Sequence, residues 1–502
     1  MTTPSSGAAD QAAEVARGSG VVFAGNLLNR ALRLITNWFL SGALGTAGYG
    51  LYELARTVVT ILASLAPLGA DKGMVLFGAR YRASGERERL KGALLASLGI
   101  AALGGPALTA GLLLATGWVQ DPALARALRL SAPAVAIWSV LLVGVGALRG
   151  AKDMRGQTIS YLVVLPVGML ATAAAAVALG WDLEGVLIGF VLANLLSLLA
   201  TAPRMWRAYR GVLTDRSLKP RWELGPLLAF SLPEGLSSML FRVNQWTDTL
   251  MVGALATMDE VGLYRVAVSL AMLGELPSVA VNTMFQPVVA ELVYAGDEQR
   301  LREVVRIVTR WMLILAGPVY IGIYVGQDLA LAFYDTAYGD SADALSVLVW
   351  GQAVYVACVP VVALIPMSGR ARLNLINATA AALLNVGLNG VLIPTYGVTG
   401  AAMATGATLA LWSLWRVAQV WWLMGTQAFS PRALALVVAT LVLAFGGRAL
   451  SADQPLAVQL LATALAVLAF MVFAWSAGRE PEDEALLAPA RRRIAKKFGR
   501  TS

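Results

Sequence analysis

The first apolar segment of the chain, roughly residues 20 to 42, carries four polar side chains at helical spacing. They are Asn26, Arg30, Arg33 and Asn37. Spacings of four, three and four place them on one face of a helix. A charge at the bilayer centre costs at least ~2.5 kcal/mol, whereas each leucine returns only ~0.3 to 0.6 kcal/mol. No acidic residue lies between Glu14 and Glu53, so the stripe must meet a ligand, a wet cavity or a carboxylate on another helix.

We therefore assign the stripe to a cationic cavity, and a similar face in the second half of the chain contributes Arg242 and Gln245. A second set of residues serves either ion coupling or pairing between helices. It comprises Glu53, Arg56, Glu234, Asp248, Arg265 and Glu275. Within this set Glu53 and Arg56, three residues apart, can neutralise each other locally. Four asparagines of a later span are interpreted as interhelical hydrogen-bonding residues: Asn374, Asn377, Asn385 and Asn389.

The composition excludes most enzyme chemistry and indicates a polytopic membrane protein. Of 502 residues, 58% are hydrophobic and 14% charged, and the mean hydropathy is +0.68. The sequence has no histidine and a single cysteine, Cys358, which removes the commonest metal ligand and general base as well as any internal disulfide. Phosphate-binding loops and zinc motifs are also missing from the sequence. We expect no catalytic residues, no metal and no cofactor. Transport or channel activity is therefore the favoured class of function.

Applying the length needed to cross a ~30 Å hydrocarbon layer predicts about fourteen spanning helices. Their centres lie near residues 30, 60, 105, 139, 169, 192, 239, 273, 315, 357, 384, 408, 440 and 467. The start of the chain, MTTPSSGAADQAAEVARGSG, lacks the basic residues of a signal peptide. The first span is therefore expected to be retained.

Lysine and arginine fall in alternate loops, which predicts the orientation. The loops GALGTAGYG, GWDLEG, ALATMDEVG and PTYGVTG contain neither residue and are predicted to face outward. The basic connections and the tail RRRIAKKFGR are predicted to face the cytoplasm, with Arg126, Arg129 and Arg448 as exceptions. Both termini are then cytoplasmic. The formal net charge of +9 is explained by topology, and nucleic-acid binding is not expected.

A weak internal repeat divides the chain. Residues 50–52 and 262–264 are both Gly-Leu-Tyr, at an offset of 212, and Gly185 aligns with Gly400 at an offset of 215. Equal polarity of both copies predicts a parallel repeat of a six-helix unit, with a site near mid-bilayer between the copies. The predicted organisation is a cytoplasmic tail (1–18), a first lobe (19–207), a basic linker (208–224), a second lobe (225–425), two further helices (426–478) and a basic tail (479–502).

Three stretches in this order resemble a known family. They are SGALGTAGYGLYELARTVVTILASLAPLGADKGMVLFGARYRASGERERL, ELGPLLAFSLPEGLSSMLFRVNQWTDTLMVGALATMDEVGLYRVA and SGRARLNLINATAAALLNVGLNGVLIPTYGVTGAAMATG. They are similar to the Wzx-type oligosaccharide flippases of the multidrug/oligosaccharidyl-lipid/polysaccharide exporter superfamily. The resemblance implies two six-helix lobes around a cavity, two extra helices, and alternating access in a bacterial inner membrane.

The resemblance also implies a substrate. Such flippases move polyprenyl-pyrophosphate-linked repeat units from the inner to the outer leaflet for surface polysaccharides such as O-antigen, exopolysaccharide or capsule. Cationic cavity residues are thought to meet the pyrophosphate or acidic sugars, and Arg30, Arg33 and Arg242 match that description. Arginine suits phosphate because its planar fork binds oxygens bidentately and keeps its charge. The partners expected are the lipid-linked oligosaccharide, membrane lipids, a polysaccharide polymerase and glycosyltransferases.

Two other functions stay open. One is an ion-coupled multidrug exporter of the same superfamily, with Glu53, Asp71, Glu234 or Asp248 as the coupling carboxylate. The basic first helix and the count of fourteen spans disfavour it. The other is a lipid II flippase of peptidoglycan synthesis.

Overall fold

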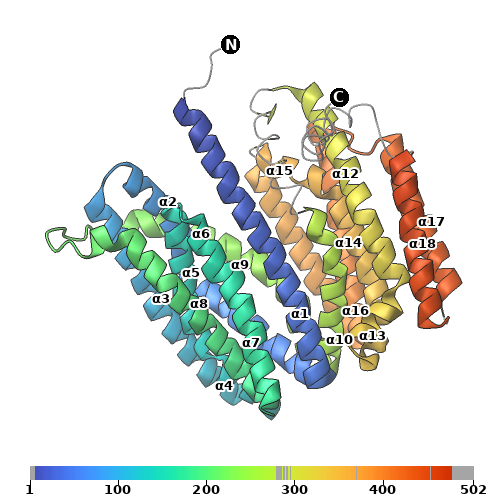
Figure 1. Cartoon of the computed structure of the whole chain (residues 1–502), viewed down its shortest axis with the longest axis horizontal. Coiled ribbons are helices and arrows are strands. Elements are labelled where there is room, and N and C mark those ends of the chain that lie inside the picture. The colour runs from blue at the N-terminus through green and yellow to red at the C-terminus, as the bar shows by residue number, and fades with distance from the viewer. Residues whose placement is uncertain are drawn as a thin grey trace, which may run out of the picture. The chain divides into compact units, whose positions relative to one another are not determined.

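The computed structural model shows an α-helical protein (Figure 1). It describes residues 6–278, 285, 289, 292–293, 296–368, 370–452 and 454–476, and no β-strand occurs in these residues. The chain divides into two compact units, Met1–Arg265 and Val266–Ser502. The predicted all-α class of multi-pass membrane protein is confirmed. The lobe boundaries stay predictions, and the basic tail 479–502 lies outside the described residues.

The helices follow one another with short connections. Up to the π-helical stretch they are α1 (Ser6–Leu65), α2 (Ala70–Ala83), α3 (Arg87–Ala115), η1 (Thr116–Trp118), α4 (Pro122–Ser131), α5 (Pro133–Gly150), α6 (Met154–Gln157) and η2 (Thr158–Val164). Next come α7 (Leu165–Ala178), α8 (Asp182–Leu213), α9 (Leu224–Leu255), α10 (Met258–Ala271) and η3 (Met272–Glu275). The remaining elements are α12 (Glu298–Val325), α13 (Gln327–Tyr334), η4 (Thr336–Ser341), α14 (Ala342–Val362), α15 (Leu364–Met367), α16 (Ala371–Met424), α17 (Pro431–Ser451) and α18 (Leu456–Ser476).

Nine helices of the described part are long and apolar enough to cross a membrane, or up to ten if the bent pair of Ala24–Leu65 and α2, which meet at 42°, is one span. Every predicted span centre lies inside one of the helices given above. Two of these helices, α1 and α16, each contain two predicted centres. The total of fourteen spans therefore stays a prediction.

Each of the two long helices is broken at one glycine. In α1 the break is Gly45, with φ 66° and ψ −178°, and in α16 it is Gly397, with φ 54° and ψ −131°. Such backbone conformations are open essentially only to glycine. Both glycines lie in loops that were predicted to face outward, GALGTAGYG and PTYGVTG. The expected loops are thus reduced to a sharp break between two consecutive helices.

Apolar packing holds each unit together. In the first unit, side chains from α2, α3 and α8 form a buried core that includes Met74, Leu94 and Tyr209. The Tyr209 hydroxyl donates a hydrogen bond to the Ala147 carbonyl at 2.9 Å, which satisfies its polar tip in the apolar core. In the second unit α12, α17 and α18 pack around Phe470. The two C-terminal helices therefore belong to that core.

The arginines at predicted outer helix ends have local partners. Arg126 forms an ion pair with Glu184 at 2.6 Å. The Arg129 Nε donates to the Thr116 hydroxyl at 2.9 Å. In the second unit Arg448 binds Asp328 through both guanidinium ends, at 2.5 and 3.0 Å. These ion pairs and hydrogen bonds explain how the three arginines can lie at predicted outer helix ends, although the positive-inside rule places arginine on the cytoplasmic side.

Within the first unit, α1 crosses the start of α10 just beyond the Gly45 break. A Cβ atom at Gly50 would overlap the Met258 carbonyl oxygen, and one at Gly262 would overlap the Thr46 carbonyl oxygen. A capping box fixes the start of α10, since the Thr257 amide donates to Glu260 at 2.9 Å and the Glu260 amide donates to the Thr257 hydroxyl at 3.3 Å. The two backbones can approach this closely only because both glycines lack a side chain.

We expect Gly50→Ala to destabilise the protein, because the added methyl group forces α1 away from α10. Overpacking of this kind costs roughly 1–3 kcal/mol. Gly99→Ala in α3 is the matched control, since a Cβ there meets nothing within 4 Å. Thermal unfolding in detergent should give a lower melting temperature for Gly50→Ala alone. Equal melting temperatures for both variants would contradict the close crossing.

Candidate functional site

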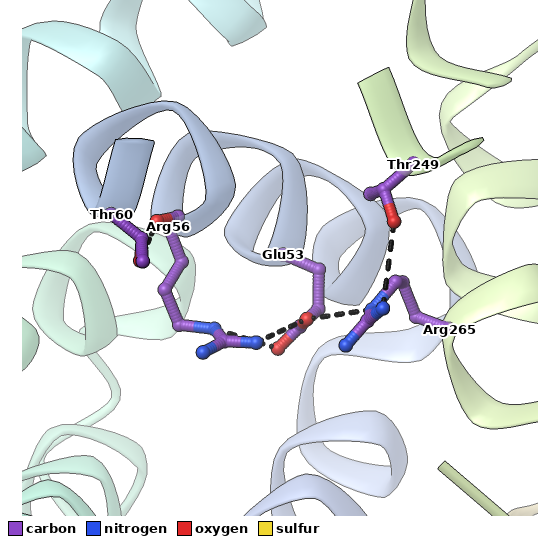
Figure 2. Close-up of polar contacts among 5 residues, drawn as sticks. All are labelled: Glu53, Arg56, Thr60, Thr249 and Arg265. Atoms are coloured by element: carbon purple, nitrogen blue, oxygen red, sulfur yellow. Dashed lines mark hydrogen bonds and ion pairs between the residues drawn. The ribbon is translucent and has the colours of Figure 1, made fainter. Parts of the chain in front are cut away.

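A buried carboxylate binds two arginines within the first unit (Figure 2). Glu53 is 0% exposed. Arg56 donates from Nε to Oε1 at 3.0 Å and from Nη2 to Oε2 at 2.7 Å, and Arg265 donates from Nε to Oε2 at 2.9 Å. Arg265 also donates from Nη1 to the Thr249 hydroxyl at 3.5 Å. One negative charge therefore serves two positive ones.

Three helices position this group. Glu53 and Arg56 lie one turn apart on α1 after the Gly45 break, and Arg265 comes from α10. From α9, the Trp246 ring lies under both guanidinium groups, with its centroid 5.1 Å from Arg56 Cζ and 4.6 Å from Arg265 Cζ. Each contact is a cation–π interaction, which is strengthened where water is excluded. The indole thus supports the two arginines that share a single carboxylate.

Arg33 joins this group from the other side of the Gly45 break. It lies within electrostatic range of Glu53, Arg56 and Arg265, and of Tyr161 in η2. Its side chain is exposed, so it is the accessible member of the group. Three arginines against one carboxylate leave an excess of two positive charges. We call Arg33, Glu53, Arg56, Arg265 and Trp246 the arginine cluster.

The first half of α1 is placed by its contact with the π-helical stretch η2. Gly25 packs against Thr158 and Leu162, where a Cβ would lie 2.5 Å from the Thr158 methyl carbon. The Asn29 Nδ2 donates to the Leu162 carbonyl at 3.4 Å. A π-helix shifts the regular hydrogen-bond ladder, and such stretches often occur at functional sites. The contact brings Tyr161 into range of Arg33.

The other predicted cavity residues are less closely joined to the cluster. Asn26, Arg30 and Asn37 are half-buried on α1, and Gln245 is exposed on α9. The side chain of Arg242 lies outside the part of the chain that the structure describes.

The remaining predicted pairing residues take separate positions. Asp248 accepts a hydrogen bond from the Tyr264 hydroxyl at 2.9 Å, while Glu234 is exposed on α9. Glu275 belongs to the second unit, within electrostatic range of Tyr320 and Tyr355. Glu53 and Arg56 are therefore the predicted pair that the structure brings together, and Arg265 adds to it.

A further buried arginine, Arg416 on α16, was not singled out from the sequence. Its Nη2 donates to the Val362 carbonyl and to Asn374 Oδ1, both at 2.9 Å, and its Cζ lies 4.8 Å from the Trp412 ring centroid. Asn377 and Gln419 exchange hydrogen bonds of 2.6 and 3.0 Å nearby. As expected, Asn374 and Asn377 join the two halves of α16. Asn389 instead donates to the Asn385 carbonyl and to Asn385 Oδ1, within one half of the helix. In both pairs, Asn374–Arg416 and Asn377–Gln419, the partners are 42 residues apart in sequence and lie on opposite sides of the Gly397 break, which brings them into contact.

An apolar pocket of about 400 Å³ lies between the end of α1 and α9. It is lined mainly by Leu65, Leu68, Leu232 and Leu236. Polar residues continue along α1 from the cluster to this pocket. The Thr60 hydroxyl donates to the Arg56 carbonyl at 2.7 Å, and the hydroxyl of Ser64, which lines the pocket, donates to the Thr60 carbonyl at 2.7 Å. Pockets of this size and lining suit an apolar ligand.

In chemical terms the arginine cluster can bind an anion. Guanidinium donors aimed at a shared carboxylate are equally suited to phosphate oxygens. In the described part of the chain no group of three or more carboxylate or cysteine side chains is arranged to hold a metal ion.

We expect Trp246→Leu to lower the melting temperature, because both arginines lose an aromatic surface worth roughly 0.5–2 kcal/mol each. Trp246→Phe keeps a ring and should lose less. Trp206→Leu on α8, where the side chain is 51% exposed, serves as the control. Thermal unfolding in detergent measures all three variants, and an equal loss at both tryptophans would exclude the stacking role.

Comparison with curated proteins finds flippases. The chain is 31% identical over 217 residues to the Probable flippase AglR of Haloferax volcanii, covering 39% of this chain and 44% of that protein. It is 27% identical over 254 residues to the Lipid III flippase of Escherichia coli K12, covering 48% and 59%. The matches thus span about half the length of these relatives.

Comparison with solved structures shows the same fold in distant proteins. The lipid II flippase MurJ in an inward closed conformation matches with a TM-score of 0.67 at 14% identity, covering 91% of this chain and 100% of that one. An inward-facing multidrug resistance MATE family transporter of the MOP superfamily matches with a TM-score of 0.65 at 17% identity, covering 80% and 96%. A MOP superfamily transporter from Pyrococcus furiosus gives 0.57 at 18% identity, covering 81% and 95%.

Two family models match the sequence. The MatE model matches residues 233–391. The model described as polysaccharide biosynthesis protein matches residues 15–293, more than half of the chain, and includes every residue of the arginine cluster. The chain belongs to the polysaccharide biosynthesis protein family.

Proposed function

We propose that this protein is a flippase that moves polyprenyl-pyrophosphate-linked oligosaccharide repeat units from the inner to the outer leaflet for surface polysaccharide synthesis. The observation that carries the proposal is the excess positive charge of the arginine cluster, built around a fully buried carboxylate. Buried charge in a membrane helix is costly and marks a functional site. The family and the flippases among the relatives support the same class.

The proposed ligand group is the pyrophosphate. A pyrophosphate esterified at both ends keeps one negative charge on each phosphorus, which balances the excess charge of the cluster. Arg33 is exposed and would meet the ligand first, while Arg56 and Arg265 lie behind it. Arginine retains its charge when desolvated and offers paired donors to phosphate oxygens. The cluster would therefore hold the headgroup without holding the sugars.

We assign the outlying polar residues to the sugar part of the substrate. Arg30 and Arg242 are related by the same 212-residue offset as the two Gly-Leu-Tyr copies, and so are Arg33 and Gln245. Asn26 and Asn37 extend the face of α1 on which Arg30 and Arg33 lie. These side chains offer hydrogen-bond donors and acceptors suited to hydroxyl groups. The apolar pocket lined by Leu65 and Leu236 would receive the first part of the prenyl chain.

The proposed setting is a bacterial inner membrane with both termini in the cytoplasm. Alternating access would expose the site to one side at a time, as repeat-built transporters do. A polysaccharide polymerase and glycosyltransferases are the proposed partners, since they use and supply the same lipid-linked sugar.

Transport of a fluorescent polyprenyl-pyrophosphate-linked oligosaccharide in proteoliposomes tests the proposal. We expect the wild-type protein to protect the label from an external reductant, and the double variant Arg30→Ala, Arg33→Ala to reduce the rate about 10-fold or more, since a charged hydrogen bond contributes roughly 1.5–3 kcal/mol. Arg126→Ala, which removes an exposed ion pair far along the chain, is the control. Unchanged transport by the double variant at normal protein level would remove the site assignment.

The alternative is an ion-coupled exporter of cationic drugs, favoured by the MatE match over residues 233–391. It would use Glu53, Asp71, Glu234 or Asp248 as the coupling carboxylate. Including a cationic dye and lipid II in the same proteoliposome assay separates the candidates. Transport of the dye alone would favour the exporter, and transport of lipid II in preference to the oligosaccharide would favour a peptidoglycan flippase.

A further inference from the structure

Glu53 and Arg265 occupy equivalent positions in the two copies of the predicted repeat. They are 212 residues apart, the offset that also relates Gly50 to Gly262 and Thr46 to Met258. The backbone contacts are reciprocal, since Gly50 packs on the Met258 carbonyl and Gly262 packs on the Thr46 carbonyl. Reciprocal contacts between equivalent residues are the property of a twofold axis. The ion pair therefore lies at a local twofold axis where the two copies cross.

At this axis the carboxylate occupies part of the donor set that an anionic ligand would use. Glu53 uses both oxygens, engaging Nε and Nη2 of Arg56 and Nε of Arg265. Arg56 and Arg265 are 7% and 6% exposed. Each arginine has a single Nε–H, and Glu53 accepts both of these, so a phosphate oxygen that binds either Nε must replace the carboxylate there, while Nη donors of both groups remain for further contacts.

We infer that Glu53 is an internal competitor of the substrate's pyrophosphate for Arg56 and Arg265, and that its displacement loosens the crossing of α1 and α10. The inference rests on the proposed function. Gly50 and Glu53 lie one turn apart on α1, and Gly262 and Arg265 lie one turn apart on α10. Loss of the Glu53–Arg265 ion pair therefore removes a link between the two helices beside the glycine contact. Ligand binding is thereby tied to a conformational change.

The test is to separate ligand affinity from transport rate in Glu53→Gln. Binding of inorganic pyrophosphate to the purified protein in detergent is measured by titration calorimetry, and transport is measured in proteoliposomes. We expect Glu53→Gln to bind pyrophosphate about 10-fold more tightly, within the usual range of coupling between sites, and to transport more slowly than wild type. Glu184→Gln, which removes a surface carboxylate paired with Arg126, should change neither quantity.

Two further variants keep the test decisive. Glu53→Asp retains the charge on a shorter side chain, so a competitor should be weakened and affinity should rise by less than in Glu53→Gln. If Glu53→Gln does not fold, the double variant Glu53→Gln, Arg265→Gln keeps a neutral pair, and its binding is compared with that of Arg265→Gln alone. Equal or weaker binding on loss of the Glu53 charge would overturn the inference.

The outcomes distinguish this inference from the proposed function. If wild type transports the lipid-linked oligosaccharide and Arg33→Ala impairs it, but Glu53→Gln binds pyrophosphate no more tightly, the inference alone fails. If wild type neither binds pyrophosphate nor transports the oligosaccharide, both fail.

Discussion

The structure depends on how charges are neutralised in a helix bundle built for a membrane. Glu53 is fully buried and holds Arg56 and Arg265 in place, and Trp246 covers both guanidinium groups. Removing Glu53 would leave two buried guanidinium groups without their shared carboxylate, which is strongly unfavourable. The geometry of α1, α9 and the start of α10 is therefore set by this one electrostatic requirement.

The spacing of hydrophobic and charged residues in the sequence was enough to predict the structural features that involve residues close together in the chain. Hydrophobic length identified the helices, and a separation of three residues identified Glu53 and Arg56 as a pair. The glycines in the predicted outer loops became the breaks at Gly45 and Gly397. In each case the relevant physics acts within one or two helical turns, so the pattern could be read from a single sequence.

Features that depend on distant segments could not be predicted in the same way. Nothing in the sequence near Arg265 indicates that its partner is Glu53, since the contact requires α1 and α10 to cross. Trp246 resembles any aromatic residue of an apolar helix, and its role follows only from the two arginines above its ring. Arg416 is joined to Asn374 through the reversal of α16 at Gly397. Tertiary contact, rather than composition, distinguishes these residues.

The reciprocal packing of Gly50 and Gly262 has a consequence for how the gene can change. After a duplication the two copies are ordinarily free to diverge, because each residue is constrained only by the residues that it contacts. Here each glycine faces the backbone of the opposite copy, so a side chain gained in one copy must be accommodated by the other. The two glycines are therefore constrained together, whereas the equivalent positions 53 and 265 of the predicted repeat have diverged to glutamate and arginine. In a symmetric ancestor both positions would carry the same residue, so an ion pair between them could arise only after the copies had diverged.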